Sequence, residues 1–155
     1  MPRHARLLCV LCLLLPGATV AEHHTDADHH ARGMQTLDKV VGDRAKVTLN
    51  NLATIAPELG RWVVEFGYGQ VLSRPELDLR TRELATVAAL TALGTAGPQL
   101  RSHIHGALNV GAKPGEVVEV IMQMTAYAGF PAAINGINAA KEVFAERGVE
   151  FTPAP

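Results

Sequence analysis

Three ionisable side chains in the middle of the chain are of the types that transfer protons: Glu83, His103 and His105. Imidazoles and carboxylates are common general acids and bases in enzymes. Glu83 lies on the same helical stripe as Leu79 and Val87, which predicts that its side chain faces the core. A buried, charged carboxylate is costly when it is unpaired, so Glu83 needs a partner, a bound proton or a cavity.

His103 lies at the edge of an apolar helical stripe, beside Leu100 and Ala107, and His105 follows about 200° around the same axis. One helix therefore cannot direct both imidazoles to one point, and this spacing is poor for a metal site. Spacing alone leaves two interpretations of His103: a proton-transfer group, or a core-edge histidine bonded to a backbone carbonyl or to Glu83. Taken alone, His105 indicates a surface or interface position.

The elements that must position these side chains are helical in pattern. Gly94 ends the helix that carries Glu83, and Gly97 and Pro98 open the histidine helix, which stops at Gly111. No useful length of sequence alternates as a strand would, so the fold class is all-α. Helices are expected over residues 36–41, 43–56, 56–72, 78–93, 97–110, 114–128 and 131–148.

The first 21 residues have the pattern of a cleavable secretory signal. Arg3 and Arg6 precede an apolar run of about nine residues, far short of the roughly 20 that span a bilayer, and small residues end at Ala21. We expect a periplasmic or secreted protein without membrane attachment after cleavage; an uncleaved anchor is the alternative. Both cysteines, Cys9 and Cys12, lie in this segment, so the mature chain would contain no thiol.

The remainder divides into a polar lead-in over residues 22–34, one domain over 35–150 and a short tail over 151–155. The lead-in has no apolar period and is expected to be flexible. Its histidines could bind a transition metal weakly, although a solvated tail is the simpler interpretation; they are His23, His24, His29 and His30. Without Arg3 and Arg6, the 14 basic residues become 12 against 15 acidic ones, and no basic patch indicates a nucleic-acid partner.

The segments "SRPELDLRTREL", "QLRSHIHGALNVGA" and "YAGFPAAINGINAAKEVF" resemble the carboxymuconolactone decarboxylase family in order and spacing. The likeness covers about residues 43–147. It implies an alkyl hydroperoxidase D-like, all-α bundle of helical hairpins that assembles into homotrimers or ring-shaped homohexamers.

The family has two chemical branches. The alkyl hydroperoxidase branch reduces peroxides through a CxxC pair, and counting back from His103 puts that pair at about Ala96 and Gln99, neither of which is a thiol. Since a thiolate is the required nucleophile, peroxidase chemistry is expected to be absent. The γ-carboxymuconolactone decarboxylase branch needs no cysteine, metal or other cofactor. The resemblance to that branch implies decarboxylation, or a related lyase or isomerase step, on a lactone-type carboxylate.

The resemblance places Glu83 and His103 at one active site. We assign His103 as the proton donor and Glu83 as the group that orients or re-protonates it. His105 is assigned to the developing oxyanion, from the same or a neighbouring subunit. These three residues are the predicted catalytic set.

Two further groups are predicted to bind substrate. Arg74 and Arg80 could hold a substrate carboxylate, because guanidinium binds carboxylates bidentately, although ordinary surface salt bridges explain them equally well. Tyr127, Gly129 and Phe130 fit a pocket wall at a helix break, with ordinary core at a helix junction as the alternative.

Two features separate this chain from a typical decarboxylase: the expected export, and the run "FGYGQVLSRPE" where we expect a Trp-Gly-Asp-like segment. Either could accompany a different substrate. Two other functions stay open: an antioxidant protein, which would need a thiol in the mature chain, and a non-catalytic oligomeric binding protein on the same scaffold.

Overall fold

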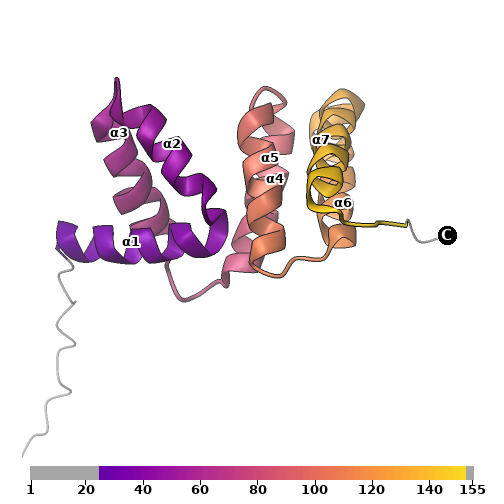
Figure 1. Ribbon diagram of the computed structural model, residues 1–155. Coiled ribbons are helices and arrows are strands. Elements are labelled where there is room, and N and C mark those ends of the chain that lie inside the picture. The colour runs from indigo at the N-terminus through magenta and orange to yellow at the C-terminus, as the bar shows by residue number, and fades with distance from the viewer. Residues whose placement is uncertain (1–24, 153–155) are drawn as a thin grey trace, which may run out of the picture.

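The computed structural model describes residues 25–152, and all regular structure in that range is helical. In chain order the elements are α1 (Asp26–Val41), α2 (Arg44–Ala53), α3 (Pro57–Trp62), the π-helical η1 (Val63–Leu72), α4 (Leu79–Leu93), α5 (Gly97–Asn109), α6 (Pro114–Gln123) and α7 (Thr125–Arg147). They pack as two groups joined side by side: α1 to α3 with η1 in one group, and α4 to α7 in the other (Figure 1). The all-α prediction is confirmed.

The expected flexible lead-in is wrong from Asp26 onward, because α1 begins there and runs without interruption to Val41. Thr25 and Asp28 form a capping box: the Thr25 side chain accepts from the Asp28 N–H, and the Asp28 carboxylate accepts from the Thr25 N–H. In the first half of α1, a small residue lets the helix approach η1 closely. A Cβ atom at Gly33 would overlap the carbonyl oxygen of Val64, so only glycine permits this approach.

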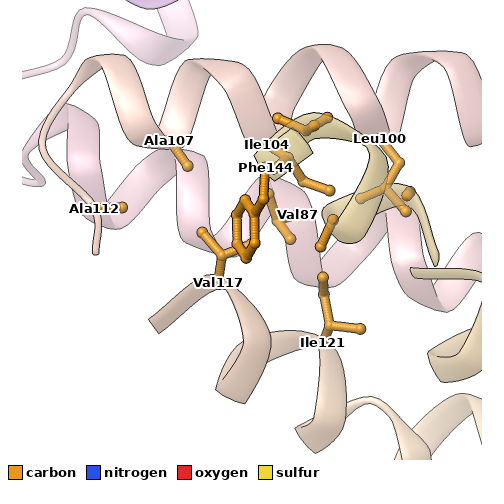
Figure 2. Packing of buried hydrophobic residues seen from close by; sticks show 11 residues of the cluster. Val87, Leu100, Ile104, Ala107, Ala112, Val117, Ile121 and Phe144 are labelled. Atoms are coloured by element: carbon orange, nitrogen blue, oxygen red, sulfur yellow. The ribbon is translucent and has the colours of Figure 1, made fainter. Parts of the chain in front are cut away.

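Each group of helices has its own apolar core. Side chains from all four helices of the second group converge on one cluster, in which Val87 of α4, Ile104 of α5, Ile121 of α6 and Phe144 of α7 lie close together (Figure 2). A smaller cluster joins α1, α2 and η1; its buried members are Leu37, Val40, Ala45, Val64 and Tyr68. The two groups meet where α1 packs on α5, and the Asn109 Nδ2 atom donates to the Val40 carbonyl oxygen at 2.8 Å.

The ends of the central helices agree with the sequence signals. The Asp78 carboxylate accepts from the Thr81 N–H at the start of α4, and Gly94 ends that helix in the left-handed conformation. The expected helix over 114–128 is shorter than predicted, since α6 ends at Gln123 and α7 begins at Thr125. Gly129, with φ 81° and ψ 168°, then kinks α7 two residues before Pro131.

The predicted signal over residues 1–21 lies outside the described residues, and so do His23 and His24 of the possible metal site. Between residues 25 and 152, no group of three or more His, Cys, Asp or Glu side chains is arranged to hold a metal ion. Within the same range, no helix combines the length and apolarity that crossing a membrane requires.

Candidate active site

Glu83 and His103 meet where α4 packs against α5. The His103 Nδ1 atom lies 2.8 Å from the Glu83 Oε2 atom, within hydrogen-bond distance. The Glu83 side chain is 0% exposed, whereas the His103 side chain is 22% exposed. The imidazole therefore lies between the buried Glu83 carboxylate and solvent-accessible space.

The neighbouring helix backbone leaves room for this pair only because residue 106 is glycine. A Cβ atom at Gly106 would lie 2.7 Å from Glu83 Oε2 and 2.8 Å from the Cγ1 atom of Val40. The second carboxylate oxygen, Glu83 Oε1, is buried and has no hydrogen-bond partner among residues 25–152. His103 is thus the one hydrogen-bond partner of the Glu83 carboxylate among the described residues. The energetic cost of burying this carboxylate therefore depends on that contact.

His103 lines a cavity of about 320 Å³ at the junction of the two helical groups. This volume is at the lower end of the range of about 300–1,000 Å³ found for small-molecule sites. Helices α1, α2 and α5 and the η1 segment contribute its walls, which are formed by Leu37, Val41, Ala45, Thr48, Leu49, Leu52, Val63, Tyr68, Gln99, Ser102 and His103.

Tyr68 is a wall residue to which the sequence analysis assigned no role. It is 7% exposed, and burial, with a smaller contribution from the negative charge of Glu83, raises the pKa of its hydroxyl above the usual 10.0. The phenol therefore stays protonated at neutral pH and can donate a hydrogen bond to a molecule in the cavity. Its position in "FGYGQ", the run that departs from the expected family pattern, was the available signal.

His105 faces away from this cavity. It is buried, and its Nε2 atom lies 3.0 Å from Glu146 Oε2 on α7. Burial lowers the pKa of His105, and the hydrogen bond to Glu146 opposes that shift. Glu146 also pairs with Arg101 and Arg44, so within one chain His105 belongs to a network that ties α5 and α2 to α7. The roughly 200° between the two histidines explains this separation.

The two arginines predicted to bind substrate do not line the His103 cavity. Arg80 pairs with Glu116 at the start of α6, and the Arg74 Nε atom lies 3.6 Å from Glu76 Oε2 in an exposed pair. Both contacts match the alternative of surface salt bridges.

The predicted pocket wall around the α7 kink is also absent from this cavity. Tyr127 and Phe130 are 77% and 72% exposed, because the kink at Gly129 turns this part of α7 to the outside of a single chain. They are therefore not the buried junction residues of the alternative interpretation either.

The comparison with known proteins assigns this chain to a family. The family model of the carboxymuconolactone decarboxylase family matches residues 57–142, a range that includes α3 to α6, the Glu83–His103 pair and most of α7. The chain belongs to the carboxymuconolactone decarboxylase family. The all-α fold expected of that family is the one observed.

Individual relatives cover different shares of the chain. A 4-carboxymuconolactone decarboxylase of Acinetobacter baylyi is 33% identical over 125 residues, which are 80% of this chain and 92% of that protein. An uncharacterized 15.0 kDa protein of Paracoccus denitrificans is 36% identical over 97 residues, 62% of this chain and 72% of the relative. Peroxisomal protein 2 of Schizosaccharomyces pombe is 29% identical over 93 residues, 60% of this chain and 44% of the relative.

Proposed function

We propose that this member of the carboxymuconolactone decarboxylase family is an exported, cofactor-free acid/base enzyme that decarboxylates a lactone-type carboxylate. The observation that carries the proposal is the buried Glu83 carboxylate bonded to His103 at the wall of a cavity. The resemblance to the Acinetobacter decarboxylase supports the reaction type.

The bond between Glu83 and His103 suits His103 to proton donation. When the imidazole is doubly protonated, its Nδ1–H donates to Glu83 Oε2, and the carboxylate stabilises the positive charge. The other ring nitrogen, Nε2, is then left to deliver a proton to a substrate in the cavity. Glu83 acts as a positioning residue that fixes the ring orientation and its protonation.

The reaction starts from a carboxylate on a saturated ring carbon, which a ring double bond links to the lactone carbonyl. The carbon–carbon bond to the carboxylate breaks and CO2 leaves, while the electron pair of that bond moves to the carbonyl oxygen as a dienolate. His103 then protonates the dienolate at carbon, which restores the carbonyl. A proton from solvent replaces the one delivered, so each turnover consumes one proton and releases one CO2.

Tyr68 is our candidate for stabilising the dienolate oxygen, the role that the sequence analysis assigned to His105. Tyr68 lines the same cavity as His103 and its hydroxyl is neutral at pH 7, whereas His105 is bonded to Glu146. A preorganised donor aimed at developing negative charge contributes strongly to catalysis in sites shielded from water.

The proposal includes self-association into homotrimers or homohexamers. The exposure of Tyr127 and Phe130 beside the α7 kink supports an intersubunit interface there. Light scattering coupled to size-exclusion chromatography measures the assembly directly, and a monomer would contradict this part of the proposal.

The experiment measures CO2 release and the ultraviolet change from 4-carboxymuconolactone, and from an analogue in which an alkyl chain replaces the acetate side chain. We expect turnover of at least one compound by the wild type and a loss of about 10²–10⁴-fold in His103→Ala. His30→Ala, at an exposed histidine on α1, is the matched control and keeps the activity. Turnover of neither compound by the wild type contradicts decarboxylation. Unchanged turnover in His103→Ala contradicts the site and favours an activity elsewhere.

A further inference from the structure

The walls of the His103 cavity are divided by chemical type. Helices α1 and α2 contribute aliphatic side chains, namely Leu37, Val41, Ala45, Leu49 and Leu52, and η1 adds Val63. The polar lining residues come chiefly from α5, which contributes Gln99, Ser102 and His103; Thr48 of α2 and Tyr68 of η1 complete them. A ligand in this cavity therefore meets an extensive apolar surface and a small set of polar atoms.

Positive charge is absent from the walls formed by the described residues. Neither Arg nor Lys lines the cavity, and the nearby family-motif arginines are engaged elsewhere: Arg80 with Glu116, Arg74 with Glu76 and Arg101 with Glu142 and Glu146. The acidic partner of His103 is the buried Glu83 side chain. A ligand with two carboxylates would have to lose the hydration of both while only one imidazole faces it, which is costly.

The decarboxylation chemistry needs only one carboxylate, the one that leaves as CO2. An apolar environment disfavours that bare carboxylate in the ground state and favours its conversion to neutral CO2. A second, permanent carboxylate, such as the acetate group of 4-carboxymuconolactone, gains nothing from the reaction and would need its own cation. The lining of the cavity contains no such cation among residues 25–152.

We infer that the substrate is a lactone-type compound whose only carboxylate is the leaving group and whose remainder is an alkyl or similar apolar chain. This inference rests on the proposed function and specifies its substrate class. The apolar chain lies along the α1–α2 wall, and the lactone carbonyl accepts from the Tyr68 hydroxyl near His103. The cavity of about 320 Å³ limits the ligand to a small molecule.

The test compares the binding of two saturated γ-lactones that cannot react. One carries a five-carbon alkyl chain on the ring, and the other carries a carboxymethyl group at the same carbon. Isothermal titration calorimetry of the full protein measures each Kd at pH 7. We expect the alkyl lactone to bind at least about tenfold more tightly, because its chain is buried against the aliphatic wall.

Two blocking variants and one control locate the binding. Leu49→Trp fills the cavity and is expected to abolish binding of the alkyl lactone; Thr48→Trp, at an exposed wall position, is the second blocking variant in case the first does not fold. Ile137→Trp is the control, because Ile137 lines a separate, mainly apolar groove of about 660 Å³ between α6 and α7. Circular dichroism checks that each variant is folded.

Each outcome has a defined meaning. Equal or tighter binding of the carboxymethyl lactone overturns the inferred substrate class and leaves decarboxylation standing, and so does the absence of binding by either compound. Binding of the alkyl lactone that survives both blocking variants but disappears in Ile137→Trp also overturns it. Conversely, tight binding of the alkyl lactone in the His103 cavity, without turnover of 4-carboxymuconolactone or its alkyl analogue, supports the preference for an apolar chain and contradicts the proposed reaction.

Discussion

The fully buried Glu83 carboxylate and the partly exposed His103 imidazole are joined by a 2.8 Å contact between two helices. Glu83 Oε1 has no further partner among residues 25–152, so the carboxylate depends on His103. The same contact that satisfies the buried group also orients the imidazole toward the cavity. Substitution of either residue is therefore expected to change both the free energy of unfolding and the proposed catalysis.

Replacing His103 by Ala is expected to lower the free energy of unfolding by roughly 3 kcal/mol, because it leaves a buried carboxylate without a partner. Glu83→Gln removes the charge first, so His103→Ala in the Glu83→Gln background is expected to cost clearly less. Urea unfolding of the wild type, both single variants and the double variant gives the coupling energy. Additive effects of the two substitutions would show that the pair does not interact energetically.

Gly106→Ala is expected to destabilise the protein by about 1–3 kcal/mol, since the added Cβ would lie 2.7 Å from Glu83 Oε2 and 2.8 Å from Val40 Cγ1. Gly97→Ala in the same helix is the matched control, because a Cβ there meets nothing within 4 Å. We expect the control to be neutral or slightly stabilising in thermal unfolding. If both variants unfold at the same temperature, the close packing of Gly106 against Glu83 does not require glycine at position 106.

Acidification is expected to destabilise the fold through His105 and Glu146. The hydrogen bond to His105, followed by Arg44 and Arg101, holds the pKa of Glu146 below its usual 4.5, so its contribution to stability is present above that pH and is lost as pH falls through the folded-state pKa. Burial holds the pKa of His105 below 6.5, so the unfolded chain takes up this proton first and acid favours unfolding there too.

Urea midpoints measured from pH 7 down to pH 3 test this expectation. Glu146→Gln is expected to flatten the decline below about pH 4.5. Glu142→Gln is the control, because Glu142 also pairs with Arg101 but has no contact with His105 among the described bonds. A wild-type midpoint that rises on acidification would contradict the assignment.

The Tyr68 hydroxyl is expected to ionise only well above pH 10. The chain has two tyrosines, so Tyr127→Phe leaves Tyr68 as the only source of tyrosinate absorbance near 295 nm. Its midpoint is expected to lie above the usual 10.0, because burial and the Glu83 charge both disfavour the phenolate. Adding Glu83→Gln is expected to lower the midpoint without restoring the usual value, since burial is the larger cause. A midpoint at or below 10 would mean that the hydroxyl is open to water.

Several features of this protein could be predicted from local sequence. Helix α4 starts after Asp78 and ends before Gly94, as the cap residues indicate, because caps act through hydrogen bonds and backbone conformations within a few residues. The burial of Glu83 followed from its position on an apolar stripe. The family, too, was evident from motifs that a single chain carries in a fixed order.

Other features depend on contacts between distant segments. Helix α1 over residues 26–34 has little apolar period, and it packs on η1 through glycines whose partners the sequence does not reveal. The cavity also depends on distant segments: Tyr68 lies 35 positions before His103 in the chain, yet both residues line the same cavity. Arg74 and Arg80 carry the right chemistry for a carboxylate, but the fold pairs them with glutamates outside that cavity.

Local sequence is sufficient to predict the helical class, the central helix ends and the need of Glu83 for a partner, because periodicity, capping and the cost of a buried charge are local properties. The packing of distant segments sets three further outcomes: His103 is this partner, His105 bonds to Glu146 instead, and the cavity walls are mainly apolar and contain no Arg or Lys. Those outcomes depend on how α1, α2, η1 and α5 pack together, and packing between distant segments is set by the fit of whole surfaces.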